Sequence, residues 1–441
     1  MVRNLVLKPL IQSSFTRPST SSASLLLLLS SPHIIQMQIW NSTYGGIRTY
    51  VREGPEVSPG LNWALAAKGV IVQGKVFPNL TPSELKQSGA TIAQSLTEFL
   101  VHVRGSVVGG ASEISKAQFG KLIKQVTNHL SSTPNIFVHD GAIGSSPKCD
   151  AKLRVISDSP SAILSLSNIL YKTPSRSVSH DSCPLTVYVA TSISPSVVEA
   201  VGVGSYSNGL IAADIERSFL VLCGEAFSDA SGTKKALSAL SEPVIAARGG
   251  IPLPARILVS GGSVIILFAP EDTIQSCADS LISPDAGIIL SPQVVAPLFQ
   301  ARKAGGSNLF KLPTAIVFAC SDPSGCIPTV SKLSPGQAAY QFLAGYQGGN
   351  FVPAFSRGHS SIDPLELSKA LLAKLKENQV STYLININRG KETLSGKEFI
   401  QLVDSTLSRT IQPFQAKGDL EGKYRAFLLG KYTRLPDEFS F

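Results

Sequence analysis

The sequence is poor in charged residues, in cysteine and in long apolar runs. Only 16% of its 441 residues are charged and 43% are hydrophobic, whereas soluble domains carry about 25% charged residues. A disordered, charge-driven chain is therefore excluded. Six cysteines are too few and too scattered for a disulfide scaffold. No apolar run approaches the ~18 residues that a membrane-spanning helix needs, so no transmembrane segment is expected.

The first 52 residues have the composition of a targeting segment. They contain five basic residues and no acidic residue, and a Ser/Thr-rich stretch lies at 13–24. This pattern is typical of an organelle transit peptide. The leucine run 25–29 would also suit a secretory signal, but it is shorter than the usual minimum of about 7 apolar residues. We expect a mitochondrial transit peptide over 1–52, with a plastid address or a disordered tail as alternatives.

The basic balance is weak outside this segment. The net charge is +9, and removing the five basic residues of 1–52 leaves +4 for the remaining chain. A nucleic-acid-binding domain normally concentrates its Lys and Arg residues on one face. Nucleic acid is therefore not an expected partner.

From residue 53 onward, helix-period and strand-period segments alternate, which predicts an α/β protein. Capping patterns, in which residues three apart satisfy the free groups of a helix end, mark helix starts at 115–118, 334–337, 363–366 and 395–398. The second of these helices is predicted to run to about Tyr346, and the last is the final predicted helix. Strands are predicted at 136–139, 153–156, 185–189, 263–268, 314–320 and 382–387. Pro and Gly residues at 243–254 predict a boundary between an N-terminal domain, 53–243, and a C-terminal domain, 244–441.

Common catalytic motifs are missing from the sequence. It contains no phosphate loop, paired-histidine zinc helix, nucleophile elbow or CxxC pair. Cys320 and Cys326 flank a turn beside Asp322; they suit isolated thiols better than a metal clip. The histidines at 102, 129, 139, 180 and 359 are dispersed, so we expect surface or structural roles for them.

One segment carries a specific resemblance. From Pro313 to Tyr346 the sequence is PTAIVFACSDPSGCIPTVSKLSPGQAAYQFLAGY. A strand, an acidic turn, a Pro-Thr-Val-Ser stretch and a helix opening with Ser-Pro follow in an order that resembles the ATP-dependent phosphoenolpyruvate carboxykinases. Weaker similarity extends over 85–411. The resemblance implies a two-domain α/β fold with a C-terminal mononucleotide-binding domain, and conversion of oxaloacetate and ATP to phosphoenolpyruvate, carbon dioxide and ADP with magnesium and manganese.

The residues that the resemblance implies are largely replaced. The substrate-binding arginine of the family falls at about Gln94, and the metal-binding histidine falls near Ala255. Lys234 or Lys235 falls at the position of the lysine that contacts the second metal in the family. Between 280 and 290, where the family has an aspartate pair, only Asp285 is present.

The phosphate loop of the family is also replaced, by residues 269–276 after the predicted strand 263–268. Gln275 stands where the family has lysine, and Ser276 stands where it has threonine. Glu271 and Asp272 would begin the following helix, where they complement the helix dipole and repel an incoming polyanion. We therefore expect a degenerate nucleotide-binding domain with no catalytic residue, metal or cofactor.

These observations favour a catalytically inactive member of the family that serves as a structural or assembly subunit of a mitochondrial complex, with protein partners. One alternative is a metabolite sensor in which Lys234 and Lys235, with Arg248 or Arg256, hold an anion, although a solvated helix face is the favoured interpretation of the two lysines. The other alternative is a residual ATP-dependent phosphoenolpyruvate carboxykinase with relocated catalytic groups.

Overall fold

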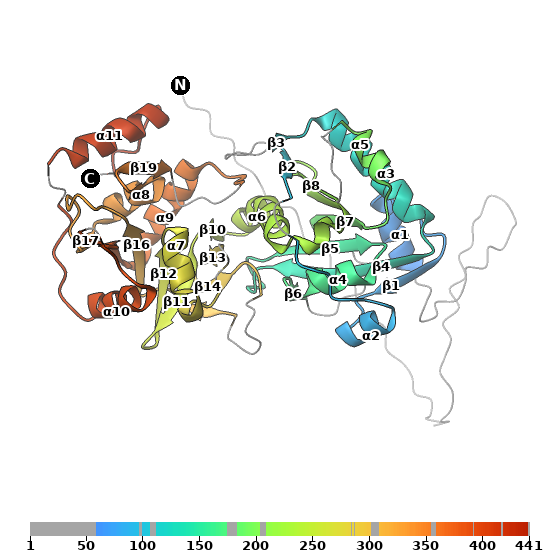
Figure 1. Ribbon diagram of the computed structural model, residues 1–441, viewed down its shortest axis with the longest axis horizontal. Helices are drawn as coiled ribbons and strands as arrows, with labels where there is room; N and C mark the ends of the chain where they lie inside the picture. Colours follow the sequence, from blue (N-terminus) through green and yellow to red (C-terminus); the bar gives the residue numbers. More distant parts are fainter. Residues whose placement is uncertain are drawn as a thin grey trace, which may run out of the picture. The chain divides into compact units, whose positions relative to one another are not determined.

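The computed structural model, drawn in Figure 1, describes residues 59–96, 99–105, 112–173, 183–202, 209–283, 285, 287–300, 308–353, 359–390, 392–415 and 418–439. The predicted targeting segment, 1–52, lies outside the described residues. Residues 53–441 form one compact unit. The division of this unit at residue 243 stays a prediction; Pro243 lies inside a helix, α6 (Ala230–Ala247).

The larger sheet is mixed. Its strands are β1 (Lys75–Pro78), β2 (Val101–Arg104), β3 (Ser112–Glu113), β4 (Asn135–Ile143), β5 (Ala151–Ser157), β6 (Tyr171–Lys172), β7 (Leu185–Ala190), β8 (Gly209–Asp214) and β9 (Phe219–Gly224). Among the described residues their order is β1-β4-β5-β7-β9-β8-β2-β3, with β6 beside β4. The central strands β5, β7 and β9 are parallel neighbours. β7 and β8 are buried along their whole length, as expected for strands covered on both faces.

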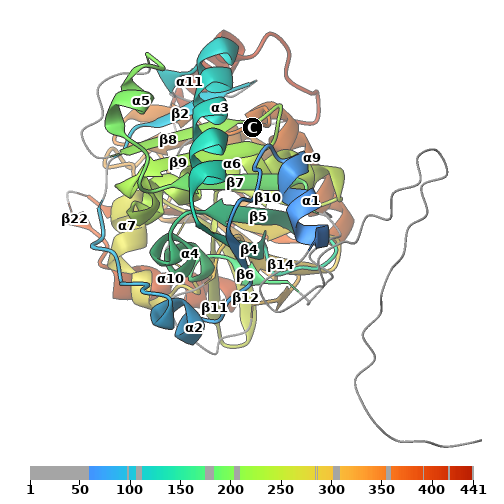
Figure 2. The same cartoon turned by 90° about the vertical axis from the view of Figure 1, so that its right-hand side faces the viewer.

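Helices cover both faces of this sheet. Besides α6 they are α1 (Pro59–Ala67), α2 (Pro82–Gln87), α3 (Lys116–Ser132), α4 (Pro160–Ser167) and α5 (Pro195–Glu199), with a 3-10 turn η1 (Glu225–Ser228). Residues of α1, α3 and α5 share one apolar core with one face of the sheet, and residues of α2, α4 and α6 share another core with the opposite face. Figure 2 shows α3 lying across the strands on the first of these faces.

A second, smaller sheet follows along the chain. Its strands are β11 (Arg256–Ser260), β12 (Ser263–Phe268), β16 (Ala315–Cys320), β17 (Val330–Leu333) and β20 (Ser381–Asn386). Among the described residues they are ordered β11-β12-β16-β20-β17. The helices that pack on this sheet are α7 (Glu271–Ser276), α8 (Pro335–Leu343), α9 (Pro364–Asn378), α10 (Gly396–Leu407) and α11 (Leu420–Lys431). α8, α9 and α11 share a core with one face, and α7 and α10 share a core with the other, which agrees with their places in Figure 1.

A third sheet contributes to two of these cores. It contains β10 (Ile251–Leu253), β13 (Ile288–Leu290), β14 (Val294–Pro297) and β15 (Phe310–Lys311). Alternate residues of a strand point to opposite faces. Ile288 and Leu290 accordingly pack in the core of the second sheet, whereas Ile289 packs in a core of the larger sheet. The short pairs β18 (Ala344–Gln347) with β19 (Asn350–Pro353) and β21 (Asn388–Arg389) with β22 (Glu392–Thr393), and the turn η2 (Ala278–Ser280), complete the described elements.

The predicted α/β fold class is confirmed, and so are the predicted strands and helix starts. At the start of α3, Ser115 Oγ accepts from Gln118 N (3.2 Å), and Gln118 Oε1 accepts from Ser115 N (3.0 Å). The same reciprocal pair begins α8 at Ser334 and α10 at Ser395, and Asp363 Oδ1 caps α9. These caps satisfy backbone donors that a helix end leaves open.

Two expectations near the C-terminus are wrong. The helix predicted to run from 334 to about Tyr346 ends at Leu343, because residues 344–347 form β18 and pair with β19. The helix beginning at 395–398 is not the final one, since α11 follows it. The start of α11 carries no side-chain cap, so the capping pattern that marks α3, α8 and α10 is missing there.

Candidate functional site

The carboxyl ends of three parallel strands, β12, β16 and β20, lie at one edge of the second sheet. In open α/β sheets, ligands bind outside the carboxyl ends of the strands. The chain leaves these ends through 269–270 into α7, through 321–327, and through 387–388. This edge contains the segment predicted as a degenerate phosphate loop and is therefore the candidate site.

The predicted phosphate-loop positions all lie in α7, two residues after β12. Glu271 and Asp272 occupy its first turn, and no side chain caps that end. Gln275 Nε2 donates to Glu271 Oε1 (2.5 Å), and Ser276 Oγ donates to a backbone carbonyl one turn back (2.8 Å). The polar groups of Gln275 and Ser276 thus bond within the helix, while carboxylates stand at the helix end that attracts anions.

A buried arginine pairs with one of the two carboxylates at the start of α7. Arg256, the first residue of β11, is only 5% exposed, and its Nη2 lies 3.6 Å from Glu271 Oε2. The guanidinium charge therefore lies against a carboxylate of the same chain. Ala255, where the resemblance places a metal-binding histidine, is completely buried.

Lys234 and Asp285, which the resemblance associates with metal binding, are brought together. Lys234 Nζ, on α6, donates to Asp285 Oδ2 (2.6 Å). The same ammonium lies 5.9 Å from the centroid of the Phe299 ring. Lys235 is exposed, because successive residues of a helix point in different directions. The two lysines therefore have different surroundings.

Arg248, the fourth cation of the anion-binding alternative, also contacts a carboxylate. Its Nη1 donates to Asp150 Oδ1 (2.5 Å), and further guanidinium nitrogens donate to the backbone carbonyls of residues 147 and 148. Lys234, Arg248 and Arg256 thus each contact a carboxylate of this chain.

A buried carboxylate organises the loop that leaves β16. Asp322 is 2% exposed. Its Oδ1 accepts from Ser324 N (2.9 Å) and its Oδ2 accepts from Ile327 N (2.7 Å), while Asn386 at the end of β20 hydrogen-bonds its backbone. Cys320 is buried and Cys326 is half-buried, and both are free thiols. Asp322 therefore shapes the turn between the two cysteines.

A further carboxyl group connects α6 to the segment that precedes α9. Glu242 Oε2 accepts hydrogen bonds from Ser360 Oγ (2.9 Å), Ser361 N (2.8 Å) and Ser361 Oγ (3.2 Å). Burial raises the pKa of Glu242 to about 7, although these hydrogen bonds act in the opposite direction. The group therefore titrates near neutral pH.

The raised pKa of Glu242 predicts that stability falls as the pH rises. The folded state holds this proton more tightly than an unfolded chain, so the contribution is fully present below about pH 4.5 and is lost as the pH passes about 7. We expect Glu242→Gln to remove this loss and to stabilise the protein by about 2 kcal/mol at pH 8 relative to wild type. Denaturant unfolding at pH 5 and pH 8 measures the difference.

The control for this prediction is Glu225→Gln, which neutralises an exposed carboxylate in η1. It should leave the pH dependence of unfolding as in wild type. If Glu242→Gln and wild type lose equal stability between pH 5 and pH 8, the titration of Glu242 does not contribute.

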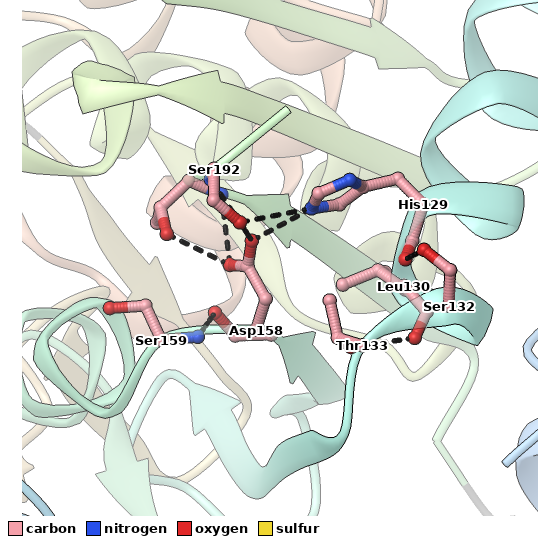
Figure 3. Close-up of polar contacts among 9 residues, drawn as sticks. His129, Leu130, Ser132, Thr133, Asp158, Ser159 and Ser192 are labelled. Atoms are coloured by element: carbon pink, nitrogen blue, oxygen red, sulfur yellow. Dashed lines mark hydrogen bonds and ion pairs between the residues drawn. The ribbon is translucent and has the colours of Figure 1, made fainter. Parts of the chain in front are cut away.

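A second polar cluster lies at the carboxyl ends of β5 and β7 in the larger sheet (Figure 3). It joins Asp158, directly after β5, to His129 on α3 and to residues 191–192 after β7. His129 Nε2 lies 3.0 Å from Asp158 Oδ2 and 3.2 Å from Ser192 Oγ. Ser192 Oγ donates to Asp158 Oδ2 (2.7 Å), and Thr191 donates from N and Oγ1 to Asp158 Oδ1 (2.8 and 2.9 Å).

This cluster contains the residue types of a serine hydrolase without the required arrangement. In such a triad the two ring nitrogens of histidine contact serine and aspartate separately. Here one nitrogen, Nε2, faces both Ser192 and Asp158, and the hydroxyl donates to the carboxylate. Burial opposes ionisation of Asp158, but hydrogen bonds from His129 and the 191–192 turn outweigh it and lower its pKa to about 2. The geometry supports a structural carboxylate that fixes the turn.

Comparison with known proteins decides the family. A family model described as phosphoenolpyruvate carboxykinase, in its ATP-dependent form, matches residues 105–269 and 292–404. The chain belongs to this family. The predicted resemblance is thereby confirmed, and the α/β fold agrees with it. The matched residues leave out 270–291, the stretch that contains α7 and Asp285.

Curated members of the carboxykinase family are similar over shorter stretches. The chain is 30% identical over 115 residues to a phosphoenolpyruvate carboxykinase (ATP) of Flavobacterium johnsoniae, covering 23% of this chain and 22% of that protein. It is 34% identical to the proteins of the same name from Leptospira biflexa, over 107 residues, and Christiangramia forsetii, over 115 residues. These matches cover 21% and 23% of this chain, and 20% and 22% of those proteins. The chain thus matches about a fifth of the length of these relatives.

The residues present do not suit the divalent metals that the carboxykinase family implies. Hard cations take several oxygen ligands, mostly carboxylates, carbonyls and waters. Within the described ranges, no group of three or more His, Cys, Asp or Glu side chains is placed to hold a metal ion. Asp285, the remaining acidic residue of the 280–290 stretch, contacts Lys234 instead.

Sequence reasoning missed the polar clusters around Asp158, Asp322 and Glu242. Each joins residues far apart in the chain: 34 positions separate Asp158 from Ser192, and 118 separate Glu242 from Ser360. The signal available was the position of Asp158 and Asp322, each two residues after the end of a predicted strand.

In the part of the chain that the structure describes, no helix has both the length and the apolar character needed to cross a membrane.

Proposed function

We propose that this chain is a catalytically inactive phosphoenolpyruvate carboxykinase-like protein that serves as a structural or assembly subunit of a mitochondrial complex. The observation that carries the proposal is the start of α7, where Glu271 and Asp272 occupy the first turn and Arg256 lies against Glu271. A triphosphate at this strand end would meet two carboxylates, and the nearby cation, Arg256, already contacts one of them.

Phosphoryl transfer depends almost entirely on positioning and on neutralising the phosphate charge. Loss of one preorganised donor costs about 10²–10³ in rate. Here the glycine-rich loop, its lysine and the metal-binding histidine expected from the family are replaced, and only Asp285 stands where the family has an aspartate pair. The packing of the fold is kept, with continuous cores on both faces of the two main sheets. A kept fold with most of the family's site residues replaced is what the proposed structural role requires.

Ligand-induced stabilisation tests the inactive state. We expect the melting temperature of the purified protein to change by less than about 1 °C with millimolar Mg-ATP, oxaloacetate or both, because a ligand stabilises a protein only through binding to the folded state. An ATP-dependent carboxykinase of the family, measured in parallel, should be stabilised by Mg-ATP. Saturable stabilisation of this protein by Mg-ATP would contradict the proposal.

The same titration separates the alternatives. Stabilisation by an organic acid alone would favour a metabolite sensor, and loss of that stabilisation in Lys235→Met would assign the exposed lysine to the anion site. Formation of phosphoenolpyruvate, abolished by Lys234→Met with Lys235→Met, would favour a residual carboxykinase.

Native-gel separation of mitochondrial complexes with mass spectrometry tests the assembly role and the mitochondrial localisation together. The protein should be present in mitochondria and should migrate far above its own 46.6 kDa. Migration at the monomer mass, or recovery in plastids, would contradict the corresponding part of the proposal.

A further inference from the structure

The contact between Lys234 and Asp285 occupies the carboxylate on which a divalent cation would depend. The ammonium nitrogen lies 2.6 Å from Asp285 Oδ2, and Oδ2 is also 3.5 Å from Ser283 Oγ. A divalent cation would stand about 2.0–2.6 Å from the same oxygen. A metal bound at this oxygen would lie close to the ammonium, and the two positive charges would repel each other.

The surroundings of Lys234 hold the ammonium in place. The Lys234 side chain is 13% exposed and that of Asp285 is 31% exposed. The ring of Phe299, which is 2% exposed, lies on the ammonium at 5.9 Å from its centroid, within the range of a cation–π interaction. Lys234 therefore contacts a carboxylate and an aromatic face at once, and both contacts fix it.

The pair also joins separate parts of the fold. Lys234 lies in the first two turns of α6, which packs on the larger sheet. Asp285 lies between η2 and β13, and Phe299 follows β14, both in the segment of the third sheet. Removing one partner of a half-buried pair would leave the other charge without compensation.

We propose that the Lys234 ammonium is a built-in replacement for a divalent cation at Asp285, so that this part of the fold is closed by an internal ion pair and does not bind metal. The inference is independent of the assembly role, because it concerns the stability and the metal affinity of the isolated chain.

Unfolding of four full-length variants tests the ion pair. Lys234→Met and Asp285→Asn should each lower the melting temperature by about 3 °C. The double variant should lose clearly less than the sum of the two, since a coupled pair gives non-additive effects. Lys235→Met, which removes the neighbouring exposed ammonium, should stay within about 1 °C of wild type. Additive losses, or equal losses in Lys234→Met and Lys235→Met, would overturn the ion pair.

Manganese binding tests the replacement. With protein at 100-fold molar excess over trace Mn²⁺, the electron paramagnetic resonance signal of free Mn²⁺ should stay unchanged for wild type, and its melting temperature should be the same with EDTA and with MnCl₂. Depletion of the free signal by wild type, lost in Asp285→Asn, would overturn the inference. That result would leave the proposed inactive state standing, because the latter depends on Mg-ATP and not on manganese alone.

Discussion

Replacing Asp158 by alanine should destabilise the protein by about 3 kcal/mol, because its buried carboxylate accepts several hydrogen bonds that would be lost, two of them from the half-buried Thr191. The side chain of Asp158 is 3% exposed. It accepts from the backbone nitrogens of Thr191 and Ser192 at 2.8 and 3.0 Å and from both hydroxyls. These bonds hold the turn that follows β7, so their loss should also loosen that turn.

Denaturant unfolding at pH 7 measures this effect, and a pH series identifies its electrostatic part. The folded pKa of Asp158 is about 2, below its ordinary value of 3.8, so its contribution is present above about pH 4 and is lost as the pH falls toward 2. The difference between wild type and Asp158→Ala should therefore shrink below pH 4. Glu199→Ala, which removes an exposed carboxylate on α5, should change stability by less than about 0.5 kcal/mol. A difference that stays constant down to pH 2 would exclude the ionised carboxylate as its cause.

Gly396→Ala is expected to destabilise the protein by about 3 kcal/mol through overpacking. Gly396 is the first residue of α10, and a Cβ atom there would lie 1.9 Å from the carbonyl oxygen of Ser276, at the end of α7, and 2.9 Å from Cys277 N. These are backbone atoms, so α10 must move away from α7. Gly396 thus packs against the C-terminal end of α7, the helix that stands where the family has its phosphate loop.

The matched control is Gly120→Ala in α3. A Cβ atom there meets nothing within 4 Å, so the alanine should stabilise the helix by up to about 1 kcal/mol. Melting temperatures measured by calorimetry compare the two variants. If the melting temperature of Gly396→Ala equals that of Gly120→Ala or exceeds that of wild type, the close packing of α7 against α10 does not constrain the fold.

Local signals predicted most of the secondary structure. Capping pairs such as Ser115 with Gln118 and Ser395 with Glu398 act over three residues, so the helix starts follow from the sequence alone. Apolar runs such as 263–268 form buried strands because strands covered on both faces need apolar residues throughout. The same reasoning failed at residues 344–347. They were predicted as the end of a helix, but they form the strand β18 because they pair with β19.

The candidate site divides in the same way. The sequence by itself determined the family, and it determined that residues 269–276 place carboxylates where a phosphate loop would need glycine and lysine. Only the tertiary structure decided that Lys234 meets Asp285, that Arg256 meets Glu271 and that Arg248 meets Asp150. These pairs join residues 51, 15 and 98 positions apart. Which charged side chains come into contact over such separations depends on how the sheets and helices pack, and no local sequence pattern encodes that packing.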